Sequence, residues 1–195
     1  MEAVGQNADW DFFKKQPFGM LMAGQTILSL IFLILPVFSA YFDQGGWLAF
    51  STSSCLFLTS LVMNLLHLFR LNRRTIQAGN AAFFVPCALI IFISSVIFGF
   101  LYLFSTLAYL VAFIQSLSYG FRHILWTFIG LVMVILLSLV NLYLGILLYR
   151  AAPNSRLMAL TTIVIEGSKT EFLEGRGPQF SPTSPNPPPN PQFSI

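Results

Sequence analysis

Polar side chains interrupt the long apolar stretches of this 195-residue sequence, and eight of them are the first candidates for chemistry. They are Gln25, Ser29, Asn64, His67, Ser94, Ser95, Ser138 and Asn141. Such residues either line a transport or proton path or form hydrogen bonds between neighbouring helices. A conduction path usually needs ionisable groups, and His67 is the one such group among the eight. We therefore favour hydrogen bonds between helices.

Little else in the sequence suggests catalysis. It contains seven acidic residues, and six of them lie in the terminal segments outside the apolar stretches. No nucleophile–base pair, carboxylate pair or glycine-rich phosphate loop is recognisable. We therefore expect a protein that is not an enzyme and that has no catalytic residues, no metal site and no cofactor.

The two cysteines, Cys55 and Cys87, both lie within apolar stretches. Their spacing suggests neither a metal site nor a disulfide framework, so we expect reduced thiols. Cys87 lies near the end of its stretch that the charge pattern places towards the cytosol. This position makes Cys87 a candidate palmitoylation site.

The last residues of the chain match two kinds of peptide motif. The run Asn190-Pro191-Gln192-Phe193 resembles the NPx-aromatic signals that endocytic and phosphotyrosine-binding-type adaptors bind by strand addition. At the end of the sequence, Phe193-Ser194-Ile195 resembles a class II PDZ ligand. Both motifs suggest cytosolic adaptors as partners.

Proline adds further candidate motifs in the same segment. Residues 182–185 fit the PxxP pattern that SH3 domains recognise in polyproline helices. Ser181 and Ser184 each precede a proline, so both are candidate sites of proline-directed phosphorylation.

The composition is that of a membrane protein. Hydrophobic residues make up 56% of the chain and charged residues 9%, whereas a soluble domain has about 25% charged residues. The net charge of +3 is small, and lysine and arginine are few and lie between apolar stretches. We therefore expect no nucleic-acid partner.

Four apolar stretches cover residues 18–42, 47–69, 81–114 and 124–149, and none contains a charged residue. A helix needs roughly 20 apolar residues to cross the hydrocarbon core of a bilayer. Backbone groups in a bilayer must be paired internally, so uninterrupted stretches of this length predict helices. We expect an all-α, polytopic membrane protein with an antiparallel four-helix transmembrane bundle. The third helix should cross near residues 83–105 and then tilt or continue.

Basic residues predict the orientation, because they favour the cytosolic side. Only Arg122 lies in a connection on the opposite side of the four stretches. The other side carries Lys14, Lys15, Arg70, Arg73, Arg74, Arg150 and Arg156. Both termini should therefore be cytosolic.

We expect three parts: a cytosolic N-terminal segment (1–17), the transmembrane domain (18–149) and a cytosolic tail (150–195). Within the tail, residues 157–165 are apolar but too short to span a membrane, so they either rest on its surface or form an extended segment. From residue 175 onward, proline and polar residues dominate and predict disorder.

Small residues recur four positions apart, as in Gly19 with Ala23 and Ser95 with Gly99. Such pairs let helix backbones approach closely. We interpret both pairs as packing positions, with a homo-oligomer as a further possibility.

Several runs in these stretches follow the pattern of one family of four-span membrane proteins. Residues 17–25 (PFGMLMAGQ) are similar to the Leu-Gly-x-Leu-x-x-x-Gln opening of that family's first helix. Residues 47–50 (WLAF) and 64–69 (NLLHLF) are similar to its second helix, and residues 85–86 (VP) and 101–103 (LYL) to its third. These runs resemble the MARVEL-domain proteins of the plasmolipin and MAL type, and the resemblance covers residues 14–150.

The resemblance implies a membrane-organising and trafficking protein of vesicles or specialised membrane domains. Its location would be the plasma membrane, or Golgi and endosomal vesicles, and its partners membrane lipids and tail-binding adaptors. The 21 phenylalanines offer bulky side chains that can select lipid order and thickness. The alternative function is a small channel or transporter, or an accessory subunit of one.

Overall fold

The computed structural model describes residues 9–38, 46–71, 76–78, 81–83, 86–152 and 157–172. Four long helices dominate it: α1 (Phe18–Phe38), α2 (Gly46–Leu68), α3 (Cys87–Ser116) and α4 (Phe121–Ala151). All four are long and apolar enough to cross a membrane. The prediction of four long apolar helices is therefore confirmed, and the chain has the features of an integral multi-pass membrane protein.

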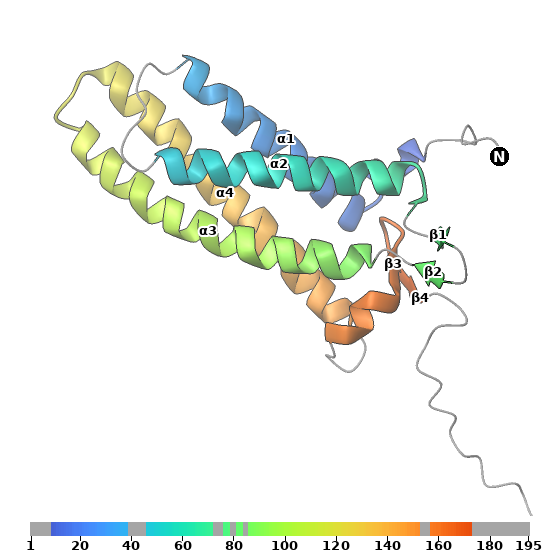
Figure 1. Ribbon diagram of the computed structural model, residues 1–195. Helices are drawn as coiled ribbons and strands as arrows, with labels where there is room; N and C mark the ends of the chain where they lie inside the picture. Colours follow the sequence, from blue (N-terminus) through green and yellow to red (C-terminus); the bar gives the residue numbers. More distant parts are fainter. Residues whose placement is uncertain are drawn as a thin grey trace, which may run out of the picture.

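The helices form a ring in which α1 contacts α2, α2 contacts α3, α3 contacts α4, and α4 returns to α1. Figure 1 shows the end of α1, the start of α2 and the α3–α4 turn together at one end of the bundle. The start of α1 and the end of α2 lie at the opposite end. The small elements described next gather at that opposite end.

Six short elements accompany the bundle in the described part of the chain. A 3-10 helix, η1 (Trp10–Lys14), precedes α1, and a hairpin of β1 (Ile76–Ala78) and β2 (Ala81–Phe83) precedes α3. After α4 come a second 3-10 helix, η4 (Leu157–Thr162), and then β3 (Ile163–Ile165), which pairs antiparallel with β4 (Thr170–Phe172). We call the bundle end that holds η1, η4 and the β3–β4 hairpin the capped end.

The third helix differs from its expected bounds at its start. Residues 81–83 are strand β2, and α3 begins only at Cys87, directly after Pro86. Proline lacks a backbone N–H and suits the position just before or at the start of a helix. The helix then continues without a break to Ser116.

The segment after α4 combines a 3-10 helix over residues 157–162 with an extended strand over residues 163–165. Its side chains Leu160, Ile163 and Ile165 are at most 2% exposed. They join a core cluster at the capped end together with Phe12 and Cys87. The described structure therefore continues to Phe172, beyond residue 149, the expected end of the transmembrane domain.

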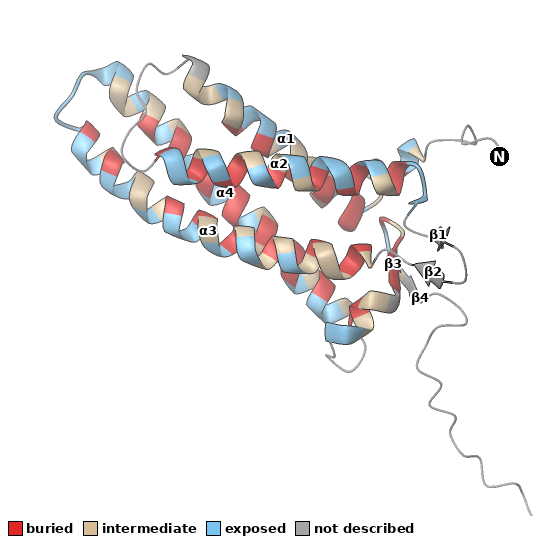
Figure 2. Cartoon of the chain, viewed as in Figure 1, coloured by how far each residue is buried: buried red, intermediate tan, exposed pale blue. Residues whose placement is uncertain are grey.

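Close packing holds α3 against α4. A Cβ at Gly99 would lie 2.6 Å from the Leu142 side chain, and one at Gly130 would lie 2.5 Å from the Tyr109 ring. Ser95, one turn before Gly99, is fully buried and also lies near Gly145 of α4. The Ser95–Gly99 pair is thus a packing position, as predicted. Figure 2 shows buried residues between the helices and exposed residues along their outer sides.

Candidate functional site: interior hydrogen bonds and the capped end

A buried amide pair joins α1 to α4. Gln25 Nε2 donates to Asn141 Oδ1 at 2.6 Å, and the two residues are 4% and 0% exposed. The Asn141 amide nitrogen in turn donates to the Leu137 carbonyl of its own helix, at 2.7 Å. Each amide therefore satisfies part of the other in a place that water does not reach.

A cluster of three side chains joins α1 to α2. The hydroxyls of Thr26 and Ser60 share a hydrogen bond with an O–O distance of 2.7 Å. Asn64 Nδ2 donates to Thr26 Oγ1 at 2.7 Å and to the Met22 carbonyl at 3.2 Å. Thr26 is thus the centre of the α1–α2 contact.

Each of the two remaining interfaces is crossed by a side-chain hydrogen bond between described residues. Ser53 of α2 and the hydroxyl of Tyr102 of α3 lie 2.7 Å apart, and both residues are fully buried. Ser138 of α4 donates to the Gly99 carbonyl of α3 at 3.3 Å. All four interfaces of the ring are therefore bridged, and such bonds typically contribute about 0.6–2 kcal/mol each in a membrane.

The sequence pointed to four of these side chains, namely Gln25, Asn64, Ser138 and Asn141, and missed four others. The missed ones are Thr26, Ser53, Ser60 and Tyr102. The sequence does contain a signal for Ser53 and Ser60. Together with residues 64 and 67 they recur at intervals of seven, four and three, so all four share one face of a helix. The face of α2 that carries them is the face turned to the interior.

Two of the predicted polar residues serve only their own helices. Ser29 donates to the Thr26 carbonyl at 2.9 Å, and Ser94 donates to the Ile91 carbonyl at 3.0 Å.

Two buried oxygens, Asn64 Oδ1 and Ser95 Oγ, have no hydrogen-bond partner among the residues described. A void of about 10 Å³ lies beside Gln25, Ser60 and Ser94, which is close to the volume that one water molecule needs.

The N-terminal segment closes the C-terminal end of α2. The backbone N–H of Asp9 donates to the Leu68 carbonyl at 3.0 Å, so it satisfies one of the carbonyls that a helix end leaves unpaired. Arg70, which follows α2 in the left-handed conformation (φ 54°), lies 3.2 Å from the Asp9 carboxylate. Phe12 stacks on the ring of His67, with 4.9 Å between centroids.

His67 belongs to this closure and not to the bundle interior. Its Nδ1–H donates to the Met63 carbonyl one turn earlier, at 2.7 Å. Its Nε2 has no partner among the described residues, and the ring borders a cavity of about 20 Å³ next to Asp9 and Glu166. The ionisable residue that the sequence placed in a span therefore lies at its very end.

The C-terminal hairpin closes the N-terminal end of α1. The Gly167 carbonyl accepts hydrogen bonds from the backbone N–H groups of Phe18 and Gly19, at 2.9 and 3.3 Å. Gly167 sits at the hairpin turn with φ of 86°, a conformation that favours glycine. A side chain there would meet Lys15, since a Cβ would lie 2.8 Å from the Lys15 Cβ. The segment before α1 thus caps the end of α2, and the β3–β4 hairpin caps the start of α1.

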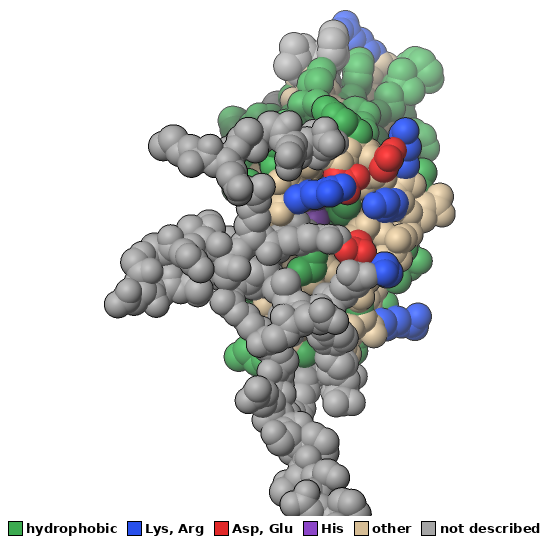
Figure 3. All heavy atoms as spheres, turned by 90° about the vertical axis from the view of Figure 1, so that its right-hand side faces the viewer, with side chains coloured by type: hydrophobic (Ala, Val, Ile, Leu, Met, Phe, Trp, Pro, Cys, Tyr) green, Lys and Arg blue, Asp and Glu red, His purple; other side chains and the backbone are tan. Residues whose placement is uncertain are grey.

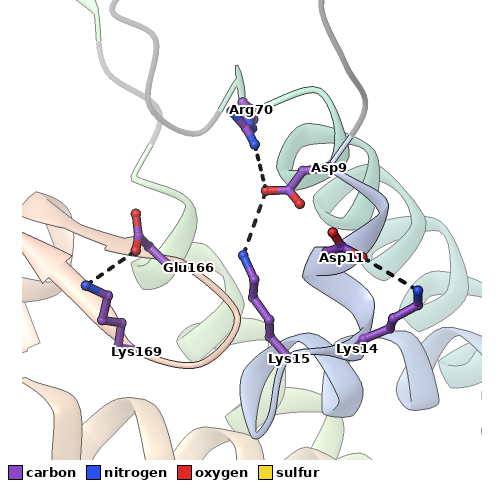
Figure 4. A network of polar contacts seen from close by, with 7 residues as sticks. All are labelled: Asp9, Asp11, Lys14, Lys15, Arg70, Glu166 and Lys169. Atoms are coloured by element: carbon purple, nitrogen blue, oxygen red, sulfur yellow. Dashed lines mark hydrogen bonds and ion pairs between the residues drawn. The ribbon is translucent and has the colours of Figure 1, made fainter.

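Charged side chains gather at the capped end (Figure 3). Asp9 lies between Arg70 and Lys15, at 3.2 and 4.0 Å, and two local pairs accompany it (Figure 4). These pairs are Asp11 with Lys14 and Glu166 with Lys169. Both lysines are more than half exposed, and exposed ion pairs contribute only about 0–1 kcal/mol to stability.

Cys87, the candidate palmitoylation site, is 3% exposed and packs into the core cluster of the capped end. The exposed cysteine is Cys55, on α2. An acyl transferase needs an accessible thiol, so the folded structure disfavours modification of Cys87.

We expect Cys87 to resist a membrane-permeant maleimide in the folded protein, because its side chain is 3% exposed within the core cluster and reaction with a thiol requires access to it. Cys55→Ala and Cys87→Ala variants, labelled in detergent and then again after denaturation, identify the reactive residue. Both thiols should react after denaturation. Rapid labelling of Cys87 in the folded Cys55→Ala variant would contradict this prediction and restore Cys87 as a modification site.

The tail candidates lie outside the described residues. They are Ser181, Ser184, Asn190, Pro191, Gln192, Phe193, Ser194 and Ile195. Within the described ranges, no group of three or more His, Cys, Asp or Glu side chains is placed to hold a metal ion. The candidate functional features are therefore the lipid-facing bundle, its hydrogen-bonded interior and the capped end. Comparisons of the chain with protein-family models, with curated proteins and with solved structures found no match.

Proposed function

We propose that this chain is a membrane-organising and trafficking protein of vesicles or specialised membrane domains. In this proposal the bundle is antiparallel, both termini are cytosolic, and the chain resides in the plasma membrane or in Golgi and endosomal vesicles. The outer surface of the bundle contacts lipid, and the C-terminal tail recruits adaptors. The resemblance of residues 14–150 to MARVEL-domain proteins supports the same function.

Unequal helix lengths are the observation that carries the proposal. The neighbouring helices α3 and α4 have 30 and 31 residues, whereas the described parts of α1 and α2 have 21 and 23. At 1.5 Å per residue the long pair measures about 45 Å, against a hydrocarbon core of about 30 Å. The long pair must tilt, project from the bilayer or thicken it locally, and each response costs fractions of a kcal/mol per Å. A bundle of this kind favours lipid of matching thickness.

The lipid-facing surface supports the same proposal. Phe100, Phe104 and Phe128 are 50–61% exposed on α3 and α4. Large rigid rings on the long helices contact acyl chains over a wide area and respond to their order. Such a surface acts on lipids without any catalytic group.

Charges favour cytosolic termini in this proposal. Lys14, Lys15, Arg70 and Lys169 lie at the capped end, and Arg122 lies in the first turns of α4, at the other end. Lysine and arginine near helix ends favour the cytosolic side. The tail that follows Phe172 would then begin at the cytosolic face.

Deleting residues 175–195 is expected to change the sorting of the protein in cells and to leave its membrane insertion intact. The deletion removes the adaptor motifs, while the last described strand, β4, ends at Phe172. Microscopy with organelle markers measures the sorting of each variant, and resistance to carbonate extraction tests its membrane insertion. Replacing residues 175–195 by a glycine–serine segment of equal length controls for tail length. Unchanged localisation of both variants would overturn the adaptor part of the proposal.

Flux measurements separate this function from the channel or transporter alternative. Interior polar side chains form hydrogen bonds across all four interfaces, with side chains at three of them and with the Gly99 carbonyl at the fourth, and the void beside them is about 10 Å³. We expect liposomes that contain the purified protein to retain ions and small solutes as empty liposomes do. Robust flux that scales with protein content would replace the proposal by the alternative.

A further inference from the structure

An apolar groove of about 290 Å³ runs between α2 and α3. Its walls are Thr59 from α2 and Ile90, Ile93, Ser94, Ile97 and Phe98 from α3. Thr59 and Ser94 also line the small interior void. The groove therefore reaches from the outer surface towards the polar interior of the bundle.

The hydroxyl groups of the groove are already engaged. Thr59 donates to the Cys55 carbonyl at 2.8 Å, and Ser94 donates to the Ile91 carbonyl at 3.0 Å. The other walls are isoleucine and phenylalanine, and the isoleucines are restricted in χ1. A ligand therefore meets a stiff, apolar surface without a free donor or a charge.

The distance of the groove from the capped end indicates which part of a bilayer would surround it. Thr59 lies nine residues before the end of α2, and Ser94 lies seven residues after the start of α3. At 1.5 Å per residue these positions are roughly 14 and 10 Å from the capped end. Arg70 and the other charges of the capped end mark the level of the headgroups. Half of a hydrocarbon core of about 30 Å measures about 15 Å. Thr59 and Ser94 lie within that distance of the headgroup level, so the groove faces acyl chains.

We infer that the groove binds one acyl chain of a membrane lipid from the leaflet next to the capped end. The inference rests on the part of the proposed function that places the four helices across a membrane. Helices and acyl chains are equally apolar, so the hydrophobic effect does not drive this contact. A chain in the groove contacts protein on more than one side, and it recovers dispersion contacts that an empty groove lacks.

Photo-crosslinking with a lipid tests the inference. The full chain is reconstituted in phosphatidylcholine vesicles that contain a phosphatidylcholine with a diazirine on one acyl chain, and the adducts are mapped by peptide mass spectrometry. We expect adducts at Ile93 and Ile97 to exceed those at Ile146 and Leu139 of α4 severalfold. All four side chains are 46–59% exposed, and at 1.5 Å per residue they lie at similar depths, roughly 8–18 Å from the helix ends at the capped end, so accessibility alone predicts similar yields.

Two substitutions on α3 sharpen the test. Ser94→Leu places a larger apolar side chain in the groove, and it removes a hydroxyl that bonds only within its own helix. Thr106→Leu is the matched control, since Thr106 likewise donates to a carbonyl of its own helix, that of Tyr102, and does not line the groove. We expect Ser94→Leu to reduce groove adducts severalfold without changing α4 adducts, and Thr106→Leu to leave both unchanged. Thr59→Leu should reproduce the Ser94→Leu result from the other wall.

Three outcomes would overturn the inference. One is an even distribution of adducts over exposed residues of α3 and α4. Another is groove labelling that neither Ser94→Leu nor Thr59→Leu reduces. The third is crosslinking of two copies through Cys55, one turn from Thr59, combined with absent groove adducts, since a second copy would then fill the groove. None of these outcomes touches the tail-deletion result, so the failure of the groove and the failure of the proposed sorting function are distinguishable.

Discussion

Gly19→Ala is expected to lower the free energy of unfolding by about 1–3 kcal/mol, the usual cost of overpacking a well-packed site. A Cβ at Gly19 would overlap the backbone carbonyl oxygen of Phe12. A backbone atom cannot rotate away as a side chain can, so either η1 or the start of α1 must move. Either movement disturbs the hydrogen bond from Asp9 to Leu68 and the stacking of Phe12 on His67.

Gly24→Ala is the matched control, because it makes the same change in the same helix. A Cβ at Gly24 would meet no atom within 4 Å. Alanine is the better helix former by about 1 kcal/mol, so this variant should be as stable as the parent or more stable. Unfolding by SDS titration from a mild detergent gives both free energies. Equal stabilities of the two variants would show that η1 does not pack against Gly19.

The second large effect is expected at the Gln25–Asn141 pair. Gln25→Leu and Asn141→Leu should each lower the free energy of unfolding by about 1–3 kcal/mol, because each leaves a buried amide partly unpaired. The double variant should lose less than the sum of the two, since it removes both partners. The coupling energy should be about 0.6–1.7 kcal/mol, the range of such bonds in membrane proteins.

Ser29→Ala provides the reference for this cycle. Ser29 is as buried as Asn141, but its hydroxyl bonds only to the Thr26 carbonyl within α1. Its loss should cost less than either amide substitution and should show no coupling to Asn141→Leu. A double-mutant cycle without coupling between Gln25 and Asn141 would mean that the α1–α4 hydrogen bond contributes nothing to the folded bundle.

The capped end shows where inference from sequence reached its limit. Residues 157–165 are apolar, and the sequence left open whether they rest on a membrane or extend. Their contact is with Phe12 and the start of α3, about 150 and 70 positions away along the chain. Segments of three to six residues have no hydrophobic period long enough to identify their partner. The partner follows only from the positions that the four helices take.

The structure also shows that Cys55, and not the candidate Cys87, is the exposed cysteine. Cys87 was chosen because it lies near a helix end, yet its side chain faces the core cluster, and Cys55 in the middle of α2 faces outward. When nearly every face of a helix is apolar, the hydrophobic pattern of its sequence does not predict which side chains face the core. The same uniformity hid the groove beside Thr59.

By itself the sequence determined the membrane spans, because the length and the apolar content of a stretch are local properties. It also identified Gln25 and Asn141 as residues that need partners, since a buried amide without one is costly. Only the tertiary structure decided that these two bind each other, that Gly167 caps α1 and that Asp9 caps α2. Those contacts depend on which helix faces meet, and that choice is made by the packing of the whole bundle.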